Sequence, residues 1–417
     1  MLRTAIAESE WYYGWVVAVA GFLAATVLFG LSYSFGVFLS PLLSAFDVGS
    51  GAVSLTFGLQ TFVVYTGAVP GGTVVDSLGA RRSSGLATVL VVAGLLGASV
   101  VRSFPVLLGW YGIVTGLGMS LLYVVAYTTV PRWFVRRRGL ATGFTSSGLG
   151  IGILVVAPIA ARLVDRFGWR GAYRWLAVGA LAVLAVATYL IADRPSDVGE
   201  AQTPGFRVAG SATRLSIRER IRDVGRVALT RPFQAVFLGW LFVWTPLYVL
   251  LNHVVRFVSV SGLQAGTGVA AISLVGLSTS LARVVVGSIA DRVGRVRTFA
   301  VSGALVAVAV PATTLADTTV SFLAVAAVFG IGYGGAGALL SPLVAELFGD
   351  ENLGTTFGLA SVAFALGGLA APTVAGVLFE RIGSYDPVFW GAGLIGLVGV
   401  GLIRFAGARR ASGSAGG

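Results

Sequence analysis

The chain contains no cysteine and no lysine, and it has a single histidine among its 417 residues. Without cysteine it cannot form disulfides, a thiol nucleophile or a cysteine metal site. One histidine excludes a multi-histidine metal centre. A chain without lysine also cannot complete the G-x-x-x-x-G-K-[ST] loop that binds ATP phosphates. We therefore expect neither a cofactor nor a metal.

Charged residues are scarce at 11%, whereas 56% of the residues are hydrophobic and the mean hydropathy is +0.89. This balance is typical of a protein that crosses a membrane several times. Apolar stretches long enough to span about 30 Å of hydrocarbon occur at 15–38, 52–75, 84–101, 105–130, 140–161, 172–192, 234–257, 268–290, 298–316, 320–343, 354–378 and 388–406. The predicted fold is an all-α polytopic membrane protein with twelve transmembrane helices in two pseudo-symmetric six-helix bundles.

The predicted parts of the chain follow from these stretches. They are an N-terminal bundle at 1–192, a cytoplasmic linker at 193–233, a C-terminal bundle at 234–406 and a disordered tail at 407–417. The linker combines an apolar stripe with arginines, which suits an amphipathic helix on an anionic leaflet. A solvated connector explains the same residues equally well.

All 29 basic residues are arginine, and the net charge is +12. Since these arginines gather at span ends, we expect a lipid bilayer as the partner and no nucleic acid. With both termini in the cytoplasm, 21 arginines fall on the cytoplasmic side and 7 on the other. We therefore expect a multi-pass protein of the plasma (inner) membrane of a prokaryote, with both termini cytoplasmic, that functions as a monomer.

The two halves repeat each other at a constant offset of 215 residues. Paired positions include Asp76 with Asp291, Gly79 with Gly294, Gly168 with Gly383, and the acids Asp165 and Glu380. A constant register along most of each half indicates duplication of a six-helix unit, with the two copies in the same orientation.

The pairs include two copies of one loop pattern, which run from Gly72 to Arg82 and from Gly287 to Arg297. In each, a carboxylate at a helix end precedes a glycine turn and arginines. This suits a charge latch at the cytoplasmic mouth, whose ion pairs stabilise one state and break in another. The predicted latch residues are Asp76, Gly79, Arg81, Arg82, Asp291, Gly294 and Arg295. The alternative is that these arginines act only as topology signals.

One charge, Arg283, interrupts the apolar stretch from Gly268 to Ala290. It lies eight residues before Asp291, and hence about 12 Å below the polar end of the span. An arginine at that depth costs about 3 kcal/mol or more, so it usually faces a cavity and marks a pathway. We interpret it as the binding site of an anion. A structural arginine bonded to the carbonyls of a neighbouring helix is the alternative.

These loops, in a chain with twelve spans, resemble the G-x-x-x-D-x-x-G-x-R/K-R/K loop of the major facilitator superfamily. Three further features are similar to its monocarboxylate transporter and oxalate–formate antiporter branch: Tyr13-Gly14-Trp15, the Arg138-Gly139 entry into a glycine-rich fifth helix, and Arg283 followed by Gly287. The resemblance implies that Arg283 binds a substrate carboxylate. It also implies that helices one, four and ten line the cavity, which selects Tyr33, Tyr127 and Tyr333 as substrate contacts. Asn252, His253 and Thr279 complete the predicted site.

The chain departs from that branch in three places. Thr279 stands where proton-coupled carriers have an aspartate, the helix-one lysine is missing, and residues 354–378 contain no charge where oxalate carriers have a lysine. One fixed cation favours a monoanion over a dicarboxylate. His253 is then the one candidate proton carrier. A histidine that bonds a neighbouring helix is the alternative, and on that interpretation we expect anion exchange or uniport.

The predicted function is secondary transport of a small organic anion, monocarboxylate-like, by rocker-switch alternating access. Two alternatives stay open: an efflux carrier for an amphipathic or other small solute, and a non-transporting sensor on the same fold. An enzyme is not expected, because an intramembrane hydrolase needs paired aspartates, clustered histidine and glutamate, or a serine–histidine pair at depth, and of these the sequence offers only His253.

Overall fold

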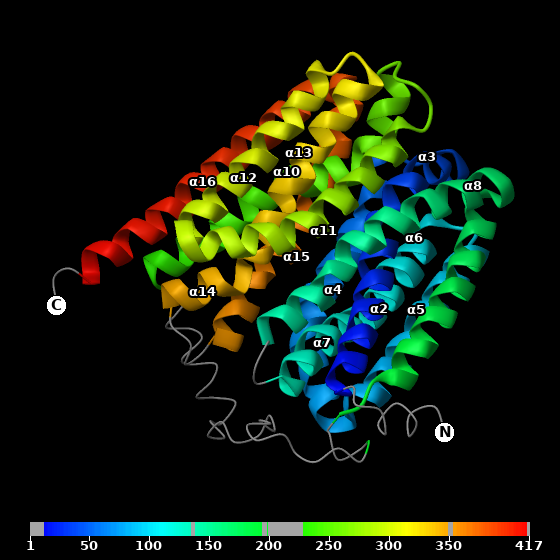
Figure 1. Ribbon diagram of the computed structural model, residues 1–417. Helices are drawn as coiled ribbons and strands as arrows, with labels where there is room; N and C mark the ends of the chain where they lie inside the picture. Colours follow the sequence, from blue (N-terminus) through cyan, green and yellow to red (C-terminus); the bar gives the residue numbers. More distant parts are fainter. Residues whose placement is uncertain (1–11, 135–137, 194–197, 199–227, 349–352, 415–417) are drawn as a thin grey trace. The chain divides into compact units, whose positions relative to one another are not determined.

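The computed structural model describes residues 12–134, 138–193, 198, 228–348 and 353–414, and within these ranges it contains helices and no β-strand. The first half of the chain holds α2 (Gly14–Tyr33), α3 (Phe35–Phe46), α4 (Ser50–Leu78), α5 (Ala80–Val100), α6 (Phe104–Leu107), the π-helix η1 (Leu108–Thr115), α7 (Gly116–Trp133) and α8 (Arg138–Leu190). The second half holds α10 (Arg231–Val260), α11 (Thr267–Val293), α12 (Arg295–Ala312), the 3₁₀ turn η3 (Thr313–Leu315), α13 (Thr319–Ala338), α14 (Leu340–Phe348), α15 (Leu353–Ile382) and α16 (Asp386–Ser414) (Figure 1).

The helical segments account for all twelve predicted spans. Ten helices in the described part are long and apolar enough to cross a membrane, and one of them, Ala141–Leu190, is 50 residues long. This helix is broken at Gly168, where φ is 66°, and so supplies two of the predicted spans. The 29-residue α4 covers the predicted span at 52–75. The all-α membrane fold is therefore confirmed.

The predicted duplication is visible in the backbone turns. Left-handed φ angles occur in three pairs offset by 215 residues: Asp47 (50°) with Gly262 (75°), Gly79 (84°) with Gly294 (99°), and Gly168 (66°) with Gly383 (76°). Glycine adopts such angles without the steric penalty of a side chain, so the chain reverses direction at equivalent places in both halves. The hydrogen bonds also repeat, since Gly79 N–H donates to Val75 O and Gly294 N–H to Ala290 O, each at 2.9 Å.

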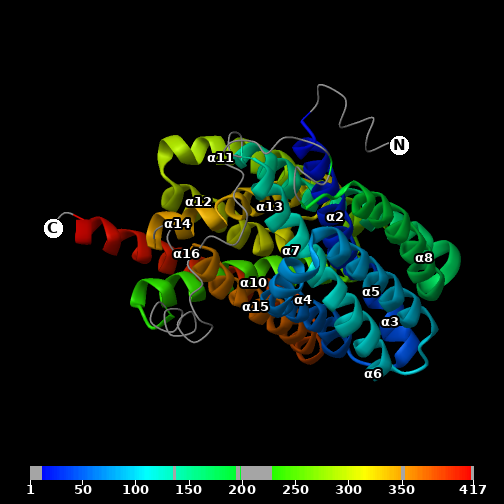
Figure 2. The ribbon, with the colours of Figure 1, turned by 90° about the horizontal axis from the view of Figure 1, so that it is seen from below.

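Contacts divide the chain into two compact units. Unit 1 consists of Met1–Ser32 and Val63–Arg214, and unit 2 consists of Tyr33–Phe62 and Leu215–Gly417. In unit 1, α5 packs against α7 and α8. In unit 2, α10 packs against α15 and α16 (Figure 2), and α12 packs against α13 and α16. The second unit therefore includes α3 and the first turns of α4, which precede the linker by more than 100 residues.

Helices α11 and α13 approach each other closely because α13 presents glycines to α11. A Cβ atom at Gly330 would lie 2.0 Å from Ser278 Oγ, and one at Gly334 would lie 2.4 Å from the carbonyl oxygen of Thr279. These distances are too short for any side chain, so the two backbones are in direct contact. The Thr279 hydroxyl donates to Gly330 O at 3.0 Å and fixes the register of the pair.

The last described helix extends beyond the predicted span at 388–406. Helix α16 continues to Ser414. The residues Ala406, Ala408, Arg409, Arg410 and Ala411 are strong helix formers that extend the preceding span. The predicted linker falls largely at 194–197 and 199–227, outside the described residues.

Candidate functional site

Arg283 lies in the middle of α11 and projects toward α13. Its guanidinium carbon is 6.0 Å from the centre of the Tyr333 ring. Its Nε atom is buried and has no hydrogen-bond partner among the described residues. A buried charged donor left without an acceptor costs about 1–3 kcal/mol or more. An arriving carboxylate would relieve that cost, because its two oxygens match the fork of the guanidinium.

Tyr33 and Tyr333 meet beside Arg283. The Tyr333 hydroxyl donates to the Tyr33 hydroxyl at 3.1 Å, and their rings lie edge to face with centres 6.3 Å apart. Both side chains are buried, with 3–4% of their surface exposed. Of the predicted substrate residues, these two and Arg283 form one continuous group in unit 2.

Further aromatic rings extend this group. Phe57 of α4 lies 6.2 Å, between ring centres, from both Tyr33 and Tyr248 of α10. Edge and tilted contacts of this kind stabilise ring pairs by about 0.5–1.5 kcal/mol. The rings present an apolar surface next to the cation, which suits a ligand with an anionic end and an apolar end.

Thr279 lies one helical turn before Arg283 on the same face of α11. It is fully buried, and its hydroxyl is bonded to the α13 backbone at Gly330. Thr279 therefore has a helix-packing contact. It stands at the position where the proton-coupled carriers of the resembling branch have an aspartate.

Asn252 and His253 belong to a separate group at the C-terminal end of α10, which we call the His253 cluster. Its other members are Ser54 of α4, Pro372 of α15 and Tyr385. Ser54 Oγ donates to Asn252 Oδ1 at 2.9 Å and lies 3.3 Å from His253 Nε2. His253 Nε2 is 2.9 Å from the carbonyl oxygen of Pro372, and Nδ1 is 3.0 Å from the Tyr385 hydroxyl.

These contacts define the hydrogen bonding of the buried imidazole. Since the Pro372 carbonyl can only accept, Nε2–H donates to it, and the Tyr385 hydroxyl then donates to Nδ1. Burial raises the pKa of the Tyr385 phenol, so this group keeps its proton. A neutral His253 is thus bonded at both ring nitrogens, as a structural histidine would be.

Near the His253 cluster, an acidic side chain of α15 binds the N-terminus of α4. The Glu380 carboxylate of α15 accepts hydrogen bonds from the backbone N–H groups of Ser50 and Gly51, the first residues of α4. A carboxylate at this position satisfies free N–H groups and interacts favourably with the helix dipole. With the Ser54 contacts, it attaches the first turn of α4 to α10 and α15 within unit 2.

Tyr127 lies in unit 1, on α7. Its ring is 5.0 Å from that of Tyr123, which in turn lies 5.5 Å from Tyr65 of α4. These half-buried tyrosines form an aromatic group within unit 1.

The predicted latch residues occupy the two equivalent glycine turns. The side chains of Asp76 and Asp291 lie outside the described residues. Arg81 and Arg82 are exposed at the start of α5, and the Arg81 guanidinium carbon is 5.9 Å from the centre of the Tyr189 ring.

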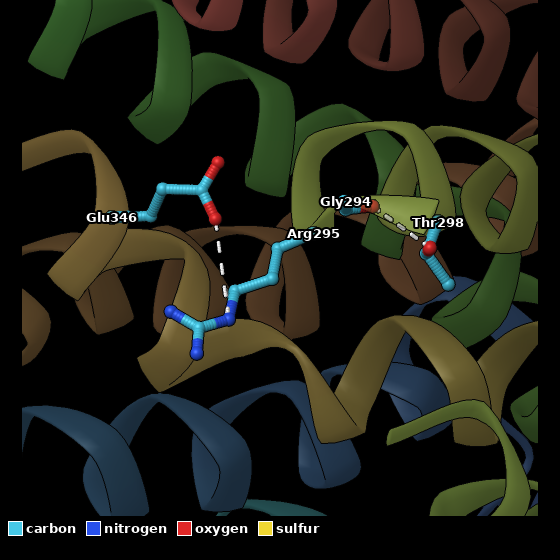
Figure 3. A network of polar contacts seen from close by, with 4 residues as sticks. All are labelled: Gly294, Arg295, Thr298 and Glu346. Atoms are coloured by element: carbon cyan, nitrogen blue, oxygen red, sulfur yellow. Dashed lines mark hydrogen bonds and ion pairs between the residues drawn. The ribbon is translucent and has the colours of Figure 1, made fainter. Parts of the chain in front are cut away.

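In the second copy, Arg295 is the first residue of α12 and reaches toward Glu346 of α14, with 4.0 Å between Nε and Oε2. Figure 3 shows this pair next to the Gly294 turn, where Thr298 Oγ1 donates to Gly294 O at 2.9 Å. Both side chains of the pair are more than one-third exposed, so it contributes less than about 1 kcal/mol to stability. It is weak enough to break during a conformational change.

Three acids contact these regions but were not predicted as functional. Glu346 pairs with Arg295, Glu380 binds the start of α4, and Asp193 accepts from the backbone N–H of Ala80 next to the Gly79 turn. Only Glu380 had a signal in the sequence, as the repeat partner of Asp165. The contacts of Glu346 and Asp193 depend on tertiary packing and have no local pattern.

The chain is similar to known proteins over most of its length. A profile of the Major Facilitator Superfamily matches residues 21–280 and 254–416. The oxalate:formate antiporter of Oxalobacter formigenes is 27% identical over 360 residues, which cover 85% of this chain and 81% of that protein. Monocarboxylate transporter 13 of Rattus norvegicus is 26% identical over 411 residues, which cover 96% of this chain and 90% of that protein.

One solved structure also resembles the chain over nearly its whole length. It is a bacterial homologue of the human lysosomal transporter Spinster, in an inward-facing and unoccupied conformation. The TM-score is 0.70 at 16% identity, and the match covers 96% of each chain. At that identity the match supports the fold alone.

Proposed function

Because the chain belongs to the Major Facilitator Superfamily and is therefore a transporter rather than an enzyme, we propose that it moves a small organic monoanion by alternating access. The observation that carries this proposal is Arg283 in an apolar span beside Tyr33 and Tyr333, with a buried Nε atom that has no hydrogen-bond partner in the part of the chain that the structure describes. Relatives named for monocarboxylates and for oxalate and formate support an anionic substrate.

The charge count favours a monoanion. Arg283 is the one charge among residues 268–290, and residues 354–378 contain none. A dicarboxylate would bring two negative charges to a single guanidinium, which leaves one of them desolvated and unpaired. A monocarboxylate places one charge on Arg283 and its apolar end against the rings of Tyr33 and Phe57.

An alternating-access carrier closes first on one side of the membrane and then on the other. Two sets of contacts suit these two closures. We assign the Gly79 and Gly294 turns, with the Arg295–Glu346 pair, to closure on the cytoplasmic side. We assign the His253 cluster and the Glu380 contact with α4 to closure on the opposite side. Each set joins helix ends through hydrogen bonds or exposed charges, which can form and break within one cycle.

Transport of a monocarboxylate is tested by counterflow. Proteoliposomes loaded with unlabelled L-lactate are expected to accumulate labelled lactate above the level of protein-free liposomes. External pyruvate should compete, whereas oxalate should compete weakly and tetraphenylphosphonium not at all. Movement of tetraphenylphosphonium without lactate would favour the efflux alternative. Lactate binding without any movement would favour a sensor.

The orientation is tested by labelling. We propose the plasma membrane of a prokaryote with both termini in the cytoplasm, from the arginine bias of 21 to 7. Asp47 and Ser77 are exposed near opposite ends of α4, in a chain without cysteine. A membrane-impermeant maleimide added to intact cells should label Asp47→Cys fully and Ser77→Cys only after lysis. The reverse pattern would invert the assignment of both closures.

A further inference from the structure

We propose that Gly337 is a specificity-determining residue: its missing side chain leaves the space that holds the Arg283 guanidinium and so limits which anions fit. The inference rests on the proposed function and concerns the same site. It identifies a residue on α13, opposite the arginine, that sets where the positive charge lies.

The geometry at Gly337 differs from that at the other glycines of α13. A Cβ atom at Gly330, Gly332, Gly334 or Gly335 would meet backbone atoms or the first atoms of side chains in α11 and α12, so helix packing explains those four. At Gly337, the three atoms nearest to such a Cβ all belong to the Arg283 side chain: Nη2 at 2.6 Å, Cζ at 3.2 Å and Nε at 3.7 Å.

A glycine inside a helix needs a reason, since alanine is more favourable there. Contact between backbones is not the reason at Gly337. The guanidinium lies against this Cα, with the Tyr333 ring one turn earlier on the same helix. Gly337 and Tyr333 together form the surface of α13 on which the arginine head rests.

The surroundings determine what moves when a methyl group is added. Helix α13 is held by direct contact of Gly334 with α11 and by the Thr279–Gly330 hydrogen bond. Tyr333 is held by its bond to Tyr33. The end of the arginine side chain is the flexible component, so alanine at position 337 displaces the guanidinium away from α13 and leaves the fold intact.

Displacement changes selectivity as well as affinity. The guanidinium moves into the volume that the anion occupies, and less room remains for the rest of the ligand. Formate has no alkyl part, so it can shift together with the displaced guanidinium. Lactate cannot shift in this way without losing the contacts of its alkyl part with the rings of Tyr33 and Phe57. A misplacement of about 1 Å in a positioned charge is large enough to change rates by one to two orders of magnitude.

The test compares Gly337→Ala with Gly391→Ala, a helical glycine of α16 whose added Cβ meets nothing within 4 Å. Both purified variants should unfold at a temperature no lower than the wild type, since alanine is favoured over glycine inside a helix. In competition against labelled lactate, Gly337→Ala should weaken L-lactate binding at least tenfold and formate binding less than threefold. Gly391→Ala should change neither.

A second arm separates positioning of the arginine from a general packing effect. In an Arg283→Lys background the fork is absent, so adding Gly337→Ala should change lactate affinity less than twofold, as in a double-mutant cycle between contacting residues. Equal losses for lactate and formate, or the same loss in both backgrounds, would overturn the role of Gly337 while leaving Arg283 as the site. Failure of the wild type to bind any carboxylate would instead overturn the proposed function.

Discussion

Arg283→Gln is expected to reduce lactate uptake at sub-saturating concentration by roughly 10- to 100-fold. The variant keeps hydrogen-bonding capacity and some length but loses the charge. A hydrogen bond to a charged group contributes about 1.5–3 kcal/mol, which corresponds to that range. The measurement is initial counterflow in proteoliposomes, with the amount of inserted protein determined for each sample.

Two companion variants make the result specific. Arg283→Lys keeps the charge but not the bidentate fork, so it should recover part of the loss. Arg404→Gln makes the same change on the exposed face of α16 and should behave as the wild type. Undiminished lactate uptake by Arg283→Gln would remove the anion site from this position and leave the arginine as a structural residue between α11 and α13.

Lactate uptake is expected to proceed without stoichiometric proton movement. The reason lies at two positions. Thr279, where the aspartate of proton-coupled carriers would stand, is buried and bonded to Gly330. His253 is fully buried, with both ring nitrogens occupied by Pro372 and Tyr385. An imidazolium there would also repel Arg256, three residues later on the same helix.

Coupling is measured with a pH-sensitive dye inside the proteoliposomes. Acidification on addition of lactate should equal that of protein-free liposomes, which accounts for passive entry of the acid. His253→Gln should show the same trace as the wild type, provided that it inserts equally well. Acidification in step with lactate in the wild type alone would identify His253 as the proton carrier. The same acidification in both would point to a different titrating group.

The sequence predicted the helices and turns well because both depend on local chemistry. The spans require only length and apolar composition, and positive φ at Gly79, Gly168, Gly294 and Gly383 accompanies turns that the 215-residue register had already paired. Helix α16 extends beyond the apolar span at 388–406. The falling hydropathy after Phe405 marks the end of the apolar run, whereas alanine and arginine continue the helix beyond it.

The candidate site was only partly accessible from the sequence. Arg283 could be found because a charge in an apolar span is rare. Its partners could not be derived in the same way, since a glycine such as Gly337 carries no chemical signal. The sequence places Asn252 and His253 on the helix that the structure labels α10. Which neighbours they contact depends on how α4, α10 and α15 pack. Their bonds to Ser54 and Pro372 emerged only from the structure.

The paired turns have a consequence for the ancestry of the chain. The reversals at Asp47, Gly79 and Gly168 recur 215 residues later, whereas Arg283 corresponds to Ala68 and His253 to Phe38 in the first half. Each copy therefore retained the turns of the six-helix unit, while the residues proposed for the anion and considered for the proton, Arg283 and His253, occur in one copy only. A descendant of this gene could adapt to another solute through changes at such unpaired positions, with the paired turns kept unchanged.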